Sequence, residues 1–92
     1  MAKVIVTLKI MPTSPDVDLS KLEQEAKRFI TEFAGEGETK SEQEPIAFGL
    51  KAIKIIFVMD EAQGSTEPLE EKVRALENVN SAEVVDVRRA VG

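Results

Sequence analysis

The chain has 92 residues, of which 42% are apolar, and it carries a formal net charge of −5. This size and apolar content are typical of one hydrophobic core, so we expect residues 1–92 to form a single domain. The sequence contains no cysteine and no histidine. It therefore has no disulfide, no thiolate zinc site, no cysteine nucleophile and no imidazole base. We expect a protein that is not an enzyme and needs no metal or cofactor, and its negative charge argues against direct nucleic-acid binding.

The amino-terminal segment 1–10 contains a short apolar run that is interrupted by Thr7 and Lys9. This run is too short and too alternating for a signal peptide or a membrane-spanning helix. Together with the absence of cysteine, it predicts a cytoplasmic protein without membrane contact.

Alternation predicts a strand over residues 3–10, followed by a helix. One face of the strand carries apolar side chains, namely Val4, Val6, Leu8 and Ile10. Pro12 and Pro15 break the strand, and Asp18 is suited to cap the helix. A further set of apolar residues recurs at the spacing of a helix, namely Leu19, Leu22, Ala26, Phe29, Ile30 and Phe33. These residues form the buried stripe of a helix that ends before the glycines at 35 and 37.

The next two segments differ in polarity. Residues 38–44 are so polar that a strand there fits only at the edge of a sheet. Residues 49–59 form the most apolar run of the chain, with alternating side chains Ile53, Ile55, Phe57 and Met59 on one face. This second pattern predicts a central strand.

A short second helix is predicted after a loop at residues 60–65. Thr66 is its expected cap, Pro68 suits its first turn, and the helix is expected to run to about Glu77. Its apolar stripe consists of Leu69, Val73 and Leu76.

The last element is predicted to be a strand that follows a turn at Asn78 and Asn80. It is identified by Val85 and Val87, which alternate with polar residues.

The resulting order is β-α-β-β-α-β, and the first and third strands are the most apolar. In a ferredoxin-like α+β sandwich these strands lie in the middle of a four-stranded antiparallel sheet, and right-handed crossovers place both helices on one face. We therefore predict this fold. The other face of the sheet is expected to be open and mixed polar, and it carries Ile5, Thr7, Lys9, Lys54, Asp86 and Arg88. Because the fold supports many functions, the function has to be argued from sites.

Phe48 lies between Pro45 and Gly49, at the start of the third strand rather than within it. As a single aromatic residue it is either part of the core or packed under a loop. Alternatively, it is an exposed wedge for a pocket of a partner, since aromatic anchors dominate interface energies. The nearby cation of Lys51 favours an interface.

Arg88 and Arg89 lie at the end of the last predicted strand. They are either solubilising charges on an edge strand or a pair that reaches carboxylates or phosphates of a partner. Neighbouring strand residues point to opposite faces, so at most one of the two is expected to face a given partner site.

Three blocks of the sequence resemble the exchange-factor domain of the elongation factor 1-beta family. They are LKIMPTSPDVDLSKLEQ, PIAFGLKAIKIIFVMDE and TEPLEEKVRALENVNSAEVVDVRRAVG, and together they span nearly the whole chain. The length and the start at the first strand are similar to archaeal members, which lack the amino-terminal domains of eukaryotic relatives. The resemblance implies a guanine nucleotide exchange factor that promotes GDP release and GTP reloading of elongation factor 1-alpha during protein synthesis.

The resemblance also implies roles for residues of the central block. In the family, an aromatic residue at the position of Phe48 inserts into a pocket of the GTPase, and Gly49 here permits the turn. Lys51 matches a family lysine, whereas Ala52 replaces a second one.

At the carboxy terminus the sequence departs from the family pattern. Eukaryotic members carry a lysine one residue from the end, which pushes into the magnesium region of the GTPase. This chain has Val91 and Gly92 there. Arg88 and Arg89 are the nearest cations, and the resemblance leaves open which of them, if either, substitutes for the lysine.

Other functions occur on the same fold. An RNA-binding module needs aromatic residues on the open face of the central strands, but the first strand has none and Phe57 falls on the helix-covered face. An enzyme of acylphosphatase type would carry a glycine-rich anion loop with an arginine after the first strand, where this chain has MPTSPDVD. A small-molecule sensing domain that dimerises through its sheet is an alternative that the sequence leaves open.

Overall fold

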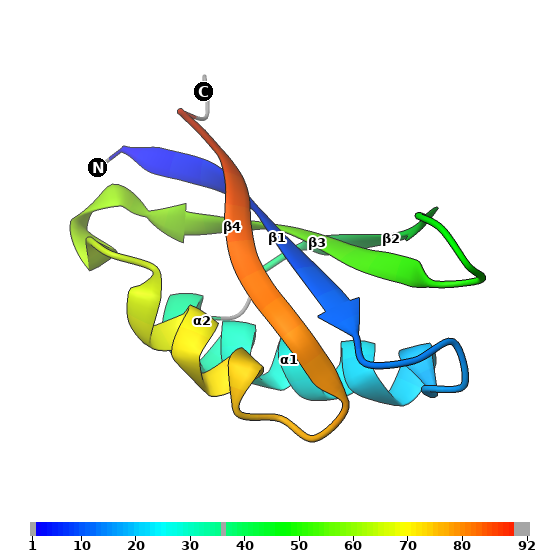
Figure 1. Ribbon diagram of the computed structural model, residues 1–92. Coiled ribbons are helices and arrows are strands. Elements are labelled where there is room, and N and C mark those ends of the chain that lie inside the picture. The colour runs from blue at the N-terminus through cyan, green and yellow to red at the C-terminus, as the bar shows by residue number, and fades with distance from the viewer. Residues whose placement is uncertain (1, 36, 90–92) are drawn as a thin grey trace.

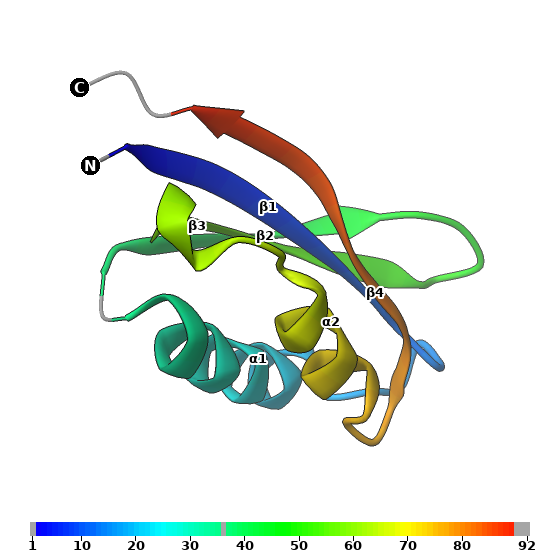
Figure 2. The same cartoon turned by 90° about the vertical axis from the view of Figure 1, so that its left-hand side faces the viewer.

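The computed structural model describes residues 2–35 and 37–89. Its elements in chain order are β1 (Lys3–Pro12), α1 (Leu19–Ala34), β2 (Thr39–Pro45), β3 (Lys51–Asp60), the 3-10 helix η1 (Glu61–Gln63), α2 (Glu67–Arg74) and β4 (Val79–Arg89). The strands form one antiparallel sheet in the order β2-β3-β1-β4. Both helices lie on one face of this sheet (Figures 1 and 2). The predicted ferredoxin-like α+β fold is therefore confirmed, with the two most apolar strands in the middle.

The core lies between the helices and the sheet. All eight predicted inward residues of the central strands are buried, namely Val4, Val6, Leu8, Ile10, Ile53, Ile55, Phe57 and Met59. The helices contribute Leu22, Ala26, Ile30, Leu69 and Val73. The predicted cap of α1 is also confirmed, because the Oδ1 atom of Asp18 accepts a hydrogen bond from the backbone N–H of Lys21 at 3.2 Å. No helix within the described residues has the length and apolarity needed to span a membrane.

The start and end of α2 differ from the prediction. Thr66 does not cap the helix with its side chain, since its Oγ1 donates to Glu70 Oε1 at 2.8 Å, while Ser65 Oγ accepts from the Glu67 N–H at 3.1 Å. The helix ends at Arg74 rather than near Glu77. A tight last turn, in which the Leu76 N–H donates to Val73 O at 3.1 Å, ends it early, and Asn78 at φ 74° then reverses the chain.

The predicted loop at residues 60–65 contains the 3-10 turn η1. The Oδ1 atom of Asp60 accepts from the Ala62 N–H at 2.9 Å and thereby starts this turn.

A bulge interrupts the pairing of β1 with β4. Thr7 lies opposite Asp86 and Leu8 lies opposite Val84, so Val85 is the extra residue of β4. This bulge shifts the alternation of side chains between the two faces of the sheet along β4.

Beyond the bulge, Val87 lies opposite Val6, and Arg89 lies opposite Val4. Directly opposed residues of an antiparallel pair share a face, so Val87 and Arg89 lie on the helix-covered face. Arg88 lies opposite Ile5 on the open face, as predicted.

Candidate partner-binding surface

Phe48 and Gly49 are the central residues of the turn that joins β2 to β3. The Leu50 N–H donates to Ala47 O at 2.9 Å across this turn. Phe48 has φ 54° and Gly49 has φ 79°. Two positive φ values define a type I′ turn, which suits the twist of a hairpin. Glycine adopts this conformation freely, whereas an L-residue with a side chain is disfavoured in it by about 1–2 kcal/mol.

The Phe48 side chain is 95% exposed. It belongs neither to the core nor to packing under the loop, in contrast to Phe57, which is 1% exposed. Ile46, another large apolar residue of the same hairpin, is also exposed. An exposed aromatic residue in a strained backbone conformation does not stabilise the isolated protein. Backbone outliers of this kind cluster at functional sites.

A groove runs beside the hairpin tip. It has a volume of about 270 Å³, and its walls include Pro15 from the β1–α1 connection, Leu19 at the start of α1, and Gly49 and Lys51 from the hairpin. Lys51 is exposed, and it takes part in no ion pair with the residues that the structure describes. The tip therefore presents one aromatic ring, one cation and a shallow groove together.

Arg88 and Arg89 extend from opposite faces of the sheet, and each forms an ion pair. Arg88 Nε lies 2.9 Å from Asp86 Oδ2. Arg89 Nη2 lies 3.1 Å from Glu61 Oε1, which joins the last strand to η1. Both guanidinium groups remain largely exposed, and Val91 and Gly92 lie outside the described residues.

The predicted contact residues fall into two groups at opposite ends of the sheet. Lys51 starts β3 at the hairpin tip, and Asp60 ends β3 opposite Lys3, beside the end of β4. The molecule is 42 Å long, and Figures 1 and 2 both show the β2–β3 turn at one end and the start of β1 beside the end of β4 at the other. One partner has to be large enough to reach both ends if all five residues contact it.

The open face of the sheet has no platform for stacking bases. The chain has four phenylalanines and no tyrosine or tryptophan. Phe29 and Phe33 are in α1, Phe57 is in the core, and Phe48 is in the hairpin turn. The interpretation as an RNA-binding module therefore lacks its required feature.

Charged groups on the open face pair with each other. Lys54 Nζ lies 3.0 Å from Glu44 Oε2. The hydrogen bond and the positive charge of Lys54 hold the pKa of Glu44 below its ordinary value, and Lys9 adds to this effect. Among residues 2–35 and 37–89, no group of three or more acidic side chains is placed to hold a metal ion.

A ferredoxin-like domain with an exposed, strained aromatic at one end and two arginines at the other has the features of a protein-interaction module. The sequence matches the EF-1 guanine nucleotide exchange domain over residues 5–90, and the chain belongs to this family. Its role is therefore guanine nucleotide exchange in translation elongation. The matched range includes Phe48, Gly49, Lys51, Arg88 and Arg89.

Curated relatives support this assignment. The chain is 46% identical over 89 residues to elongation factor 1-beta of Methanothermobacter thermautotrophicus, with 97% of this chain and 98% of the relative covered. It is 47% identical over 92 residues to elongation factor 1-beta of Methanobrevibacter smithii, with the same coverage of 97% and 98%. Among solved structures, the de novo designed protein Foldit4 matches with a TM-score of 0.62 and 17% identity over 98% of both chains. At this low identity the likeness concerns the fold alone.

Proposed function

We propose that this chain acts in the cytoplasm as one exchange-factor domain, which binds the GTPase elongation factor 1-alpha and accelerates GDP release so that GTP can reload. Family membership supports this partner. The observation that carries the proposal is Phe48, which is 95% exposed at φ 54° at the tip of the hairpin.

The proposed mechanism needs no bond chemistry from this chain. An exchange factor binds the empty GTPase more tightly than the loaded one, and linkage makes the antagonism between factor and nucleotide reciprocal. To move a GTPase from almost fully loaded to almost fully empty, the factor must bind the empty form more tightly than the loaded form by about 5.5 kcal/mol. Burial of one phenylalanine ring supplies ~2 kcal/mol. Most of the differential must therefore come from other contacts, which is consistent with contact residues at two ends.

The hairpin turn prepares Phe48 for insertion into a pocket of the GTPase. Because the turn holds the backbone of Phe48 and Gly49 in one conformation, less conformational entropy is lost on binding than for a mobile loop. In this proposal Gly49 permits the turn, and Lys51 contributes a cation next to the ring. At the other end, Arg88 and Arg89 supply cations for carboxylates or phosphates of the GTPase.

The proposal is tested by the release of fluorescent GDP from purified archaeal elongation factor 1-alpha. We expect release to accelerate when the chain is present in less than stoichiometric amount, because each molecule acts repeatedly. A release rate that stays unchanged at saturating chain would contradict the proposal. A buffer control and an equal amount of an unrelated acidic protein exclude effects of dilution and charge.

A further inference from the structure

Within the described residues, the helix-covered face of the sheet is incompletely covered at the end where β1 starts and β4 ends. Val87 lies on this face opposite Val6, yet Val87 is 56% exposed whereas Val6 is fully buried. A pocket of about 350 Å³ opens there, with Val4, Val6, Met59 and Val87 on the sheet and residues 61 and 64–66 on the connection to α2. Its volume is at the lower end of the range for ligand pockets.

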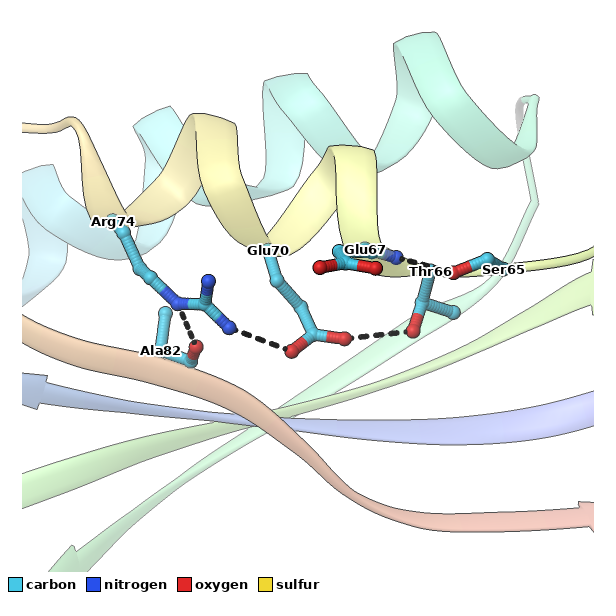
Figure 3. A network of polar contacts seen from close by, with 6 residues as sticks. All are labelled: Ser65, Thr66, Glu67, Glu70, Arg74 and Ala82. Atoms are coloured by element: carbon cyan, nitrogen blue, oxygen red, sulfur yellow. Dashed lines mark hydrogen bonds and ion pairs between the residues drawn. The ribbon is translucent and has the colours of Figure 1, made fainter.

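Polar contacts hold the wall of this pocket in place (Figure 3). Arg74 Nε donates to Ala82 O at 2.9 Å, which joins α2 to β4. Arg74 Nη2 donates to Glu70 Oε2 at 3.0 Å, and Glu70 Oε1 accepts from Thr66 Oγ1 at 2.8 Å. Since this chain of contacts fixes the start of α2 over the sheet, the pocket is preformed.

The chemistry of the pocket favours an uncharged, apolar occupant. Its floor consists of valine and methionine side chains. The start of α2 is not a free anion site, because Ser65 Oγ accepts from the Glu67 N–H at 3.1 Å and the first turn carries Glu67 and Glu70. The carboxylate of Glu61 also lines the pocket and repels anions. Phosphate or a nucleotide is therefore a poor match.

Resting on the function proposed above, we propose that this pocket receives an apolar side chain of elongation factor 1-alpha and is a second anchor of the interface. Glu61 lines the pocket and is paired with Arg89, so a partner that contacts Arg89 covers the mouth of the pocket. A partner that also takes Phe48 spans the molecule and buries apolar side chains at both ends. A second copy of this chain is a weaker occupant, since two molecules with a net charge of −5 repel each other.

A matched pair of variants tests the pocket. Val87 and Val85 lie two positions apart on β4 and are 56% and 47% exposed, but of the two only Val87 lines the pocket. For Val87→Asn we expect the concentration of the chain that half-saturates GDP release to rise about tenfold. This is the loss of affinity that is typical when one interface anchor is removed. For Val85→Asn we expect less than a twofold change. Both variants are expected to lower the unfolding midpoint by similar small amounts, because asparagine is disfavoured in strands.

The outcomes separate this inference from the proposed function. If the wild-type chain does not accelerate GDP release, the proposed function and the pocket inference both fail. If the wild type is active and Val87→Asn matches Val85→Asn, only the pocket inference is overturned.

A second measurement uses the wild-type chain and so does not depend on the folding of a variant. On titration with nucleotide-free elongation factor 1-alpha, we expect the methyl NMR signals of Val4, Val87 and Met59 to shift or broaden together. Unchanged methyl signals at saturation would overturn the inference. The same shifts on concentrating the chain alone, with a dimer in sedimentation, would overturn it in favour of a second copy.

Discussion

Arg89 and Glu61 form an ion pair, with 3.1 Å between Nη2 and Oε1, that joins the end of β4 to the turn after β3. This pair lies at the opposite end of the sheet from the Phe48 hairpin (Figure 1). The two ends can therefore be changed independently, and effects on partner binding are expected to be additive in free energy.

Phe48→Ala is predicted to separate binding from folding. Because the ring is 95% exposed, its removal is expected to change stability by less than about 0.5 kcal/mol. At a limiting concentration of the chain, the rate of GDP release is expected to fall at least about tenfold, which is typical when an interface anchor is removed. The measurements are the unfolding midpoint and the release rate of one preparation.

Phe57→Ala is the matched control for that prediction. Phe57 is 1% exposed, so its truncation is expected to cost about 3–5 kcal/mol of stability. Its activity should fall only as far as the folded fraction falls. A Phe48→Ala variant that behaves like Phe57→Ala would refute the wedge role.

Phe48→Gly is predicted to stabilise the free protein while it lowers exchange activity. Glycine relieves the strain of φ 54°, but it also gives the unfolded chain more conformational entropy, which opposes folding. The expected net increase in the free energy of unfolding is about 1 kcal/mol. Thermal unfolding monitored by circular dichroism measures this gain. A lower midpoint than that of the wild type would mean that the turn is not strained.

Arg89→Ala is predicted to lower exchange activity more than Arg88→Ala. Arg89 is paired with Glu61, which lines the pocket proposed as an anchor, whereas Arg88 is paired with Asp86 on the open face. Both substitutions are expected to change stability by at most about 1 kcal/mol, because exposed ion pairs contribute little. GDP release at several salt concentrations is the measurement. A larger loss for Arg88→Ala would place the partner on the open face instead.

The pair of Glu44 with Lys54 is predicted to make stability depend on acid pH. Since Lys54 lowers the pKa of folded Glu44 below its ordinary 4.5, the stabilisation is present above that value and is lost as pH falls through the lower folded pKa. Wild type and Glu44→Gln should therefore differ in unfolding midpoint near neutral pH and converge once the pH falls below the lowered pKa of folded Glu44. Glu32→Gln, at an exposed position of α1, is the control and should not show this convergence.

The spacing of apolar residues predicted the helices and strands well wherever buried residues recur at regular intervals. The alternation of β1 and β3 and the helical spacing in α1 placed the core, and the polarity of β2 placed that strand at the edge. Predictions were wrong at the two ends of α2, where residues close in sequence form other contacts than the pattern indicates. The hydroxyl of Thr66 bonds Glu70 rather than capping the helix backbone, and α2 ends early because Asn78 reverses the chain into β4.

The features of the candidate site were predicted only in part. The block around Phe48 and Gly49 was identified by its resemblance to a family, and the alternation of Arg88 and Arg89 correctly predicted opposite faces. The sequence has no signal for the uncovered face at Val87, because that exposure depends on the bulge at Val85 and on where α2 begins.

By itself, the sequence determined the class of fold and the family, because periodic burial and the order of blocks are written along the chain. Only the tertiary structure decided that Phe48 is exposed on a strained turn, that Arg89 meets Glu61 across 28 positions, and that the predicted contact residues occupy two ends of the sheet. The physical reason is that exposure and pairing depend on which distant segments pack together. The spacing of residues within one segment does not contain that information.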